Sequence, residues 1–325
     1  MSAPQDQIWL RTECIKVDLK SPLLLVHGGA GPQDPQGPHY LEGQSFLRRM
    51  LSQMSEDAPV DSIQDLQRQW TALSQASRKS LSAVWAMESE PLLNAGLGAS
   101  LQADGVARVS ASFMESGKRA FSAVMNATDL EHPSQLAWWL QRERFSVLDS
   151  VGVRQLSDQL QVPRRTIVTE NRFNRWIEHK RKALHEGWAG GRSGTVGAVA
   201  VDSEFHLAAT TSTGGVGNET PGRVGDSPTI AGNYCTRRVA VSCTGIGEQI
   251  MAHAVGPRLA LAVEKGDSLD TALRDCFQSA LQEGYRFAAI AIATQPEKRQ
   301  VQWAVASSRC LILWGLKNQS DILVE

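Results

Sequence analysis

Residues 194–197, Gly-Thr-Val-Gly, restrict the fold of this chain more than any other segment. They open an apolar strand at 196–201, and the turn at 202–205 leads into a second strand at 207–211. If the chain is cut before Thr195, that residue carries a hydroxyl nucleophile together with an α-amino group that can act as its base. A free α-amine titrates with a reference pKa of about 7.7 to 8.0, so no distant histidine or aspartate is needed.

Composition limits the class of protein and its partners. The 325 residues are 42% hydrophobic and 21% charged, which suits one large or two ordinary globular domains with a buried core. The formal net charge of -1 gives no electrostatic reason to expect nucleic acid or an anionic membrane as a partner. We interpret the basic runs at 164–165 and 179–182 as a solvated face or linker.

Cysteine usage and the N-terminal segment suggest where the protein resides. The five cysteines are odd in number and scattered, which fits neither a disulfide framework nor a CxxC zinc site. Residues 1–20 are polar and lack the apolar core of a signal peptide. No apolar stretch approaches the roughly 20 residues that span a bilayer. We therefore expect a cytoplasmic protein.

The first half of the chain alternates strand and helix patterns. The apolar run 23–26 reads as a buried strand that ends in the tight loop 27–31, His-Gly-Gly-Ala-Gly. One long helical pattern begins at Asp61, continues through Trp85 and stops near Pro91. Strand patterns follow at 109–113 and 120–125, and Ser134 can cap the next helix.

The second half begins with a change of composition. From 162 to 192 the chain is polar and basic and then glycine-rich, which makes it the best candidate for an exposed, cleavable connection. After the strands near Thr195 come further strands at 239–243, 288–293 and 301–305, with two helices between the first and second of these. Strands and helices in each half predict an α+β fold in which two sheets are sandwiched between helical layers.

Several segments in one order carry a resemblance to a known family. They are the loop 27–31, the Asn-Ala-Gly turn at 94–96 and, most strongly, the stretch 194–247. On these segments the chain is identified as a divergent member of the plant-type L-asparaginase and isoaspartyl peptidase family of N-terminal-nucleophile threonine hydrolases. The resemblance covers most of the chain. It implies an αββα four-layer sandwich and a precursor that cleaves itself before the threonine.

The resemblance also implies how the chain divides. Residues 1–194 would form the α-subunit part of a single αββα domain, with about 162–194 as a flexible, cleavable linker. Residues 195–325 would form the β-subunit part of the same domain. Two such αβ heterodimers would pair as a dimer.

Each candidate site residue matches one position of the family pattern. The resemblance implies that Thr195 is the nucleophile and that Gly194 precedes the scissile bond. Thr213 and Asn94 would lie beside the nucleophile, and the N–H of Gly247 would donate to the oxyanion. Arg223 and Asp226 would bind the α-carboxylate and the α-amino group of the substrate. These roles agree with the chemistry of the residues. A planar guanidinium binds a carboxylate bidentately, and a glycine lets its backbone N–H approach an oxyanion.

No cofactor is required by this chemistry. The turn from Glu88 to Leu97 resembles the family loop whose carbonyls hold a structural sodium, so the resemblance implies a possible backbone site at Glu88, Leu93, Ala95 and Leu97.

Two positions depart from the family pattern near the expected pocket. Ile246 stands where the family has a threonine whose hydroxyl joins the glycine N–H in binding the oxyanion. Loss of one such donor lowers turnover by about 10²–10³-fold. The bulky run 285–287, Tyr-Arg-Phe, replaces small residues expected at the floor of the site. Glu248 needs no function, since a carboxylate suits the start of a helix.

The sequence leaves three functional hypotheses. The first is a self-cleaving amidohydrolase that acts on the β-amide of asparagine or on β-aspartyl dipeptides. The second is a degenerate, weakly active or inactive homologue with a binding or regulatory role. The third is an active hydrolase with a shifted amide substrate. The partner that we expect for the enzyme is a small-molecule amide or dipeptide substrate.

Overall fold

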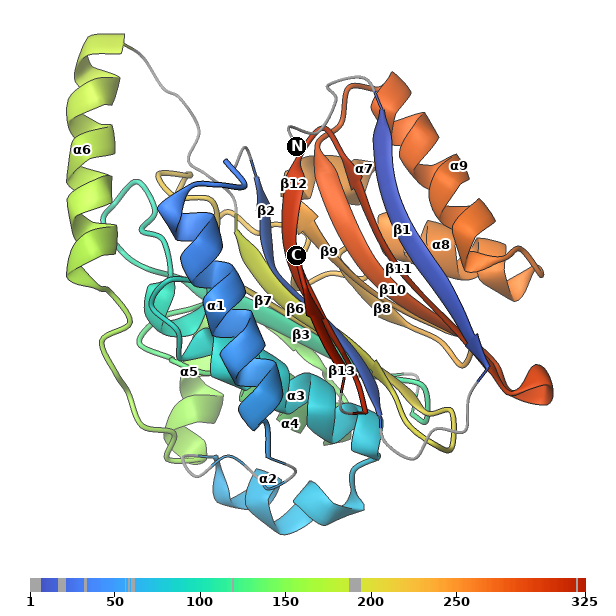
Figure 1. Cartoon of the computed structure of the whole chain (residues 1–325). Helices are drawn as coiled ribbons and strands as arrows, with labels where there is room; N and C mark the ends of the chain where they lie inside the picture. The colour runs from blue at the N-terminus through green and yellow to red at the C-terminus, as the bar shows by residue number, and fades with distance from the viewer. Residues whose placement is uncertain are drawn as a thin grey trace.

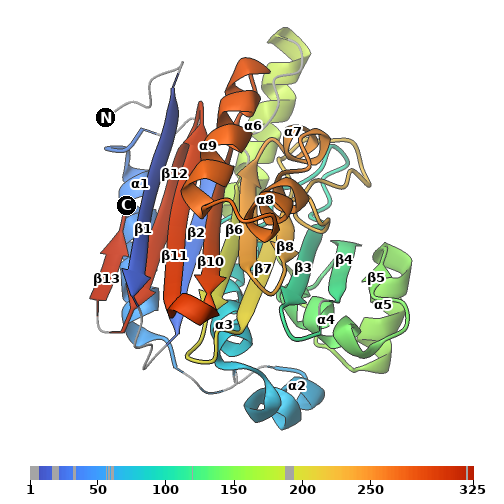
Figure 2. The same cartoon turned by 90° about the vertical axis from the view of Figure 1, so that its right-hand side faces the viewer.

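Two sheets pack face to face and helices cover the outer face of each, as Figures 1 and 2 show. This computed structural model describes residues 7–16, 22–31, 34–55, 57, 59, 62–118, 120–186, 194–319 and 321–325. The four layers confirm the expected αββα sandwich. Its order is helices, eight-stranded sheet, five-stranded sheet and helices.

The larger sheet has the strand order β13-β12-β2-β6-β7-β3-β4-β5. Its strands are β2 (Leu23–Gly31), β3 (Val109–Glu115), β4 (Phe121–Ala127), β5 (Val147–Leu148), β6 (Thr195–Val201), β7 (Leu207–Thr213), β12 (Leu311–Asn318) and β13 (Asp321–Val324). All pairs are antiparallel except β4 with β5. The central strands β6 and β7 are buried along their whole length, and their residues are mostly small or β-branched.

The smaller sheet has the order β1-β11-β10-β9-β8, with every neighbouring pair antiparallel. Its strands are β1 (Ile8–Lys16), β8 (Asn233–Cys235), β9 (Val239–Gly245), β10 (Phe287–Gln295) and β11 (Gln300–Ser308). An apolar cluster that includes Leu25, Val199, Ile290 and Trp303 fills the space between the two sheets. Alternation along each strand sends the other side chains outward to the helices.

The helices divide between the two outer faces. They are α1 (Pro38–Gln53), α2 (Gln64–Gln69), α3 (Gln75–Glu88), α4 (Pro133–Trp139), α5 (Ser150–Gln159), α6 (Glu170–Glu186), α7 (Gly247–Ala252), α8 (Val255–Glu264) and α9 (Leu269–Gln282). Helices α1, α3 and α4 contact the larger sheet, and α8 and α9 contact the smaller one. In the part of the chain that the structure describes, no helix is long and apolar enough to cross a membrane.

The long helix expected from Asp61 to Trp85 is wrong as one element. A short 3-10 turn at Trp70–Ala72 ends the first helix, and Ser74 begins α3 by accepting a hydrogen bond from the Ser77 N–H. The side chain of an N-cap serine replaces the missing helical partner of that N–H, so the chain can restart a helix in a new direction. Periodicity alone does not reveal such a break.

Helix α6 lies inside the range expected to be a flexible linker. Its 17 residues include an amphipathic pattern, and Trp176 and Arg172 contact loops of the domain. A helix with contacts to the domain thus occupies the middle of the range expected to be a linker, and the linker role stays a prediction. Residues 187–193 lie outside the described residues. The division at 194 and 195 stays a prediction.

Candidate active site

Thr195 is the first residue of β6 and lies opposite Thr213, the last residue of β7. Its Oγ donates to the Oγ of Thr213 at 3.1 Å and lies 3.5 Å from the Oγ of Ser227. The side chain is 5% exposed, and Thr213 is similarly buried. Three hydroxyls therefore converge at one end of the central strand pair. The hydroxyl of Ser227 was not anticipated from the sequence.

Asn94 joins this end of the sheet to the residue before Thr195. Its Nδ2 donates to the carbonyl oxygen of Gly194 at 2.7 Å and also to that of Gly215. Its Oδ1 accepts the Ser100 N–H, which fixes the side-chain orientation. A side-chain N–H thus lies on the carbonyl of the Gly194–Thr195 peptide bond, where it can stabilise negative charge on that oxygen.

Gly214 shows why small residues surround Asn94. A Cβ at Gly214 would lie 2.5 Å from the Cα of Ala99 and 2.7 Å from the Oδ1 of Asn94. The N–H of Gly214 donates to the carbonyl of Asn94 at 2.9 Å. The end of β7 can approach the Asn94 turn this closely only without a side chain.

Arg223 and Asp226 converge beside the start of α7. A Cβ placed on Gly247 would lie 2.9 Å from an Nη atom of Arg223 and 2.8 Å from the Oδ1 of Asp226. The two side chains therefore meet at a single glycine, whose N–H begins the helix. Asp226 directly precedes Ser227, which links this pair to the hydroxyl cluster. The structure brings the seven residues expected to take part in cleavage, catalysis and substrate binding into one region.

Glu248 has a partner that the sequence did not suggest. Its two carboxylate oxygens accept from Nε and Nη2 of Arg223, both at 2.8 Å. Burial lowers the pKa of the guanidinium, but the hydrogen bonds and charge of Glu248 outweigh burial, so that pKa lies above its ordinary value. The explanation of Glu248 by the helix dipole alone is wrong, because this carboxylate forms a bidentate ion pair.

Asp226 is held in an unusual environment. Burial raises the pKa of its carboxyl to about 7, although its backbone hydrogen bond and the charge of Arg223 oppose that rise. Its Oδ2 is buried without a hydrogen-bond partner. A buried acceptor without a donor costs about 1–3 kcal/mol, which a ligand that supplies the donor would recover.

The expected crowding by residues 285–287 is partly wrong. Phe287 is fully buried in the outer core of the smaller sheet, with its ring 5.0 Å from that of Phe277. Tyr285 packs edge-on against His253. Strand β10 begins at Phe287, so alternation turns its side chain toward the helices. Ile246, by contrast, is 37% exposed and directly precedes Gly247.

His27 is buried and neutral near Thr195. Burial lowers the pKa of its imidazole to about 3, with a smaller opposing effect from the backbone of Thr195. Its Nε2 lies 2.9 Å from the Oγ of Ser242, which in turn contacts the hydroxyl of Thr211. This polar chain joins the two sheets through side chains, which agrees with a structural role for His27.

The turn from Glu88 to Leu97 offers carbonyl oxygens. A Cβ on Gly96 would lie 2.3 Å from the carbonyl oxygen of Glu88, and one on Gly98 would lie 1.9 Å from that of Leu93. These two carbonyl oxygens thus lie against glycines of the turn, while the Ala95 carbonyl accepts the Gly98 N–H. Such a set of neutral oxygens suits a hard cation. Among the described residues, His, Cys, Asp and Glu side chains form no metal-ligating group of three or more.

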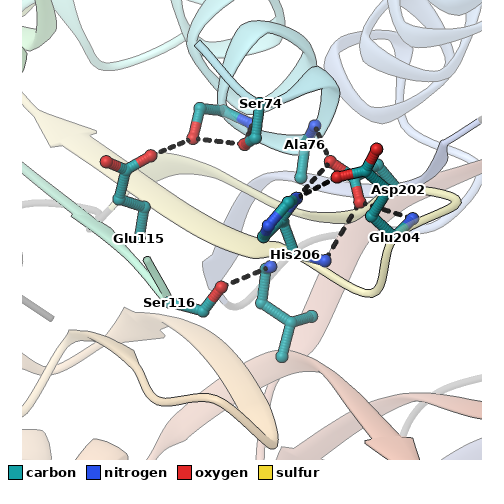
Figure 3. Close-up of polar contacts among 9 residues, drawn as sticks. Ser74, Ala76, Glu115, Ser116, Asp202, Glu204 and His206 are labelled. Carbon is teal, nitrogen blue, oxygen red and sulfur yellow. Dashed lines mark hydrogen bonds and ion pairs between the residues drawn. The ribbon is translucent and has the colours of Figure 1, made fainter. Parts of the chain in front are cut away.

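The other end of the same strands carries a second polar cluster, drawn in Figure 3. Asp202, just after β6, accepts the N–H groups of Glu204 and His206 at 3.0 Å, and its Oδ2 lies 3.3 Å from the His206 ring. Glu115 accepts from the Ser77 hydroxyl at 2.7 Å. These contacts hold a turn and the start of α3, roughly 20 Å from Thr195 along a seven-residue strand.

Comparison with known proteins agrees with this architecture. A family model described as asparaginase matches residues 20–323. The isoaspartyl peptidase/L-asparaginase of Synechocystis sp. is 33% identical over 285 residues, which cover 85% of this chain and 83% of that protein. Its counterpart in Nostoc sp. is 35% identical and covers 83% and 85%, respectively.

A third relative is the isoaspartyl peptidase of Salmonella typhimurium, which is 31% identical over 75% of this chain and 79% of that protein. The matches span both sheets and both sides of the Gly194–Thr195 bond. The chain therefore belongs to the asparaginase and isoaspartyl peptidase family of N-terminal-nucleophile hydrolases.

Proposed function

We propose that this protein cleaves its own chain between Gly194 and Thr195 and then hydrolyses the β-amide of asparagine and of β-aspartyl dipeptides. One observation carries the proposal: the Thr195 hydroxyl lies against Thr213 while Asn94 donates to the Gly194 carbonyl. A nucleophile and a donor for the developing oxyanion thus flank one peptide bond. The names of the relatives support the same pair of substrates.

Self-cleavage would proceed as an N→O acyl shift. The Oγ of Thr195 attacks the carbonyl carbon of Gly194, and Asn94 donates to the resulting oxyanion. The hydroxyl proton ends on the departing nitrogen as the C–N bond breaks and an ester forms. Water then hydrolyses the ester, which leaves a Gly194 carboxylate, a free Thr195 hydroxyl and a free α-amine.

The cleaved enzyme would use the α-amine of Thr195 as its base. The amine takes the proton from Oγ as Oγ attacks the β-carbonyl carbon of the substrate. The N–H of Gly247 would donate to the oxyanion, and the protonated amine would give its proton to the leaving ammonia or amino acid. Water hydrolyses the β-aspartyl ester and releases aspartate.

Arg223 and Asp226 would recognise the free amino-acid head group. The guanidinium pairs with the α-carboxylate and the Asp226 carboxylate pairs with the α-ammonium. An incoming α-carboxylate must displace Glu248 from Arg223 or share the guanidinium with it. The unpartnered Oδ2 of Asp226 would gain a donor from the substrate ammonium.

We also propose that the turn holds a structural sodium through the backbone oxygens of Glu88, Leu93, Ala95 and Leu97, as the resemblance implies. When bound, such an ion would rigidify the turn that carries Asn94. We also propose a cytoplasmic protein in which two αβ heterodimers pair. Both statements follow from the resemblance and the composition.

The test combines cleavage and hydrolysis in the same samples. Purified protein is incubated with asparagine or a β-aspartyl dipeptide, and mass spectrometry of the chain accompanies an assay for aspartate. We expect two chains and released aspartate, and one uncut chain with no product for Thr195→Ala. A wild-type chain that stays intact after long incubation would refute the maturation step.

The exposed side chain of Ile246 favours a second candidate. It presents an apolar side chain at the position where the family has a hydroxyl that donates to the oxyanion. An apolar side chain there would favour a bulkier or more apolar amide as the substrate. Cleaved protein that releases aspartate only from dipeptides with apolar leaving groups would favour this candidate. Cleaved protein inert toward every amide would favour a binding or regulatory role.

A further inference from the structure

A small hairpin supports the loop that carries Arg223. Within this hairpin, Leu101 pairs with Ala107. The carbonyl of Leu101 accepts the Asn218 N–H at 2.8 Å, and the N–H of Ala103 donates to the Glu219 carbonyl at 2.8 Å. The Oε1 of Gln102 accepts the Gly222 N–H at 2.9 Å. Three hydrogen bonds therefore tie the hairpin to residues 218–222, which immediately precede Arg223.

Gln102 is the centre of this support. Its side chain is 1% exposed, and its Oε1 also accepts from Arg108 at 2.7 Å. Its own N–H is bound within the hairpin to the Val106 carbonyl. The carbonyl oxygen of Gln102 accepts the Gly105 N–H at 2.9 Å within the hairpin. A carbonyl oxygen has two lone pairs, so it can accept a second hydrogen bond from another element.

That element is α6. The indole N–H of Trp176 donates to the Gln102 carbonyl at 2.9 Å. The indole ring also covers Gly105, where a Cβ would lie 3.3 Å from the ring. The Nζ of Lys180 lies over the Trp176 ring, 5.5 Å from its centre. Although α6 stands apart from the layers in Figure 1, one aromatic side chain anchors it to the hairpin.

A second contact of α6 reaches the turn that carries Asn94. Nη2 of Arg172 donates to the carbonyl of Leu92 at 3.2 Å. Burial lowers the pKa of this guanidinium to about 10, with a smaller effect from Arg175. Arg172 and Trp176 are four residues apart and therefore lie on one face of the helix.

We infer that α6 is a positioning element of the active site, in which Trp176 acts through Gln102 on the Arg223 loop and Arg172 acts through Leu92 on the Asn94 turn. This inference rests on the proposed function. The helix precedes the Gly194–Thr195 bond, so after cleavage it belongs to the first fragment while Arg223 belongs to the second. After cleavage, the hydrogen bond from Trp176 in the first fragment thus helps to position the Arg223 loop, which belongs to the second fragment.

The test replaces the donor and keeps the ring. Trp176→Phe removes the indole N–H, and Trp176→Ala removes the ring as well. Asn174→Ala is the matched control, because Asn174 is exposed on the same helix. KM and kcat for asparagine, the Kd for the product aspartate by calorimetry, and the melting temperature are measured on cleaved protein.

We expect Trp176→Phe to raise KM and the aspartate Kd by about three- to tenfold, which is the effect of one hydrogen bond, with kcat within about twofold. Trp176→Ala should raise both constants further, and Asn174→Ala should match the wild type. Arg172→Met should instead slow chain cleavage, because Arg172 acts on the Asn94 side. A purely structural role would lower the melting temperature without this selective rise in KM.

A readout that needs no activity separates the two proposals. Hydrogen exchange at the amides of Asn218 and Gly222 should quicken in both Trp176 variants and stay unchanged in Asn174→Ala. If the wild type binds and hydrolyses nothing but these amides still respond, the proposed function fails while the positioning role stands. The inference would be overturned if both Trp176 variants had the same KM, aspartate Kd and amide hydrogen exchange as the wild type.

Discussion

The two ends of the β6–β7 strand pair are both rich in polar side chains, yet they are built differently. At one end lie Thr195 and Thr213, with Asp226 close by; at the other lie Asp202 and His206. Asp202 has donors at both of its carboxylate oxygens, whereas Asp226 keeps a buried oxygen without a partner. Polar density therefore does not mark the site. We expect the site to be marked instead by an unsatisfied buried group near the proposed nucleophile, because a ligand can supply the missing hydrogen bond.

The largest expected difference between the two ends concerns Thr195. Thr195→Ala should abolish chain cleavage and lower hydrolysis by at least about 10⁴-fold, since the variant loses the only proposed nucleophile. Mass spectrometry and the aspartate assay check both effects. Cleavage of the variant at the normal rate would place the reactive hydroxyl elsewhere.

The next largest effect concerns Ile246. Ile246→Thr should raise kcat on asparagine by about 10²-fold, because it adds a hydroxyl donor beside the Gly247 N–H. Ile246→Val, which changes the shape without adding a donor, is the control. An unchanged kcat in Ile246→Thr would argue that oxyanion binding does not limit this enzyme.

The buried carboxyl of Asp226 should produce a pH effect of about tenfold on KM. Its pKa of about 7 means that Asp226 carries the negative charge that pairs with the substrate ammonium only above about pH 7. KM should therefore rise as pH falls through about 7. Steady-state kinetics on cleaved protein between pH 5.5 and 8.5 measures this change in KM. Over the same range, Asp226→Asn should show a high KM that does not change with pH.

The same shift has an opposite consequence for stability. The unfolded carboxyl ionises near its ordinary value of 3.8, so between about pH 4 and 7 the folded protein holds the extra proton. Asp226 therefore costs stability as pH rises through that window, and Asp226→Asn should be the more stable protein at pH 8. Denaturant unfolding at pH 5 and pH 8 compares the two. Equal stability at pH 8 would contradict the raised pKa.

A smaller effect is expected from the partner of Arg223. Glu248→Gln should lower KM by about two- to fivefold, because an exposed carboxylate no longer competes with the substrate for the guanidinium. High salt should reduce the difference between the variant and the wild type. A raised KM would instead show that Glu248 orients Arg223 for binding.

The far end of the strands should have the smallest effect on hydrolysis. Asp202→Ala should leave KM and kcat unchanged while costing about 2 kcal/mol of stability, since two backbone N–H groups lose their acceptor. Asp202→Asn, which retains an amide oxygen, should recover part of that loss. A tenfold fall in kcat without unfolding would remove the distinction between the two ends.

Much of the site could be predicted because its signals are local. Strand patterns before and after the 202–205 turn predicted β6 and β7, and their pairing places Thr195 opposite Thr213. The resemblance to the family implied the roles of Asn94 and Gly247. By contrast, no sequence pattern pointed to the far end of these strands, where Glu115 and Ser116 accept hydrogen bonds from Ser77 and Leu207.

The sequence by itself determined the layered fold, the residue expected to react and the residues that surround it. The layered fold follows from the periodicity of strands and helices, whereas the reacting residue and its neighbours follow from the resemblance of several ordered segments to a known family. Only the tertiary structure decided that Glu248 pairs with Arg223, that Phe287 faces the helices, and that α6 docks through Trp176. Those outcomes depend on which elements meet in space, and partners 25 or 74 residues apart leave no periodic signal in the chain.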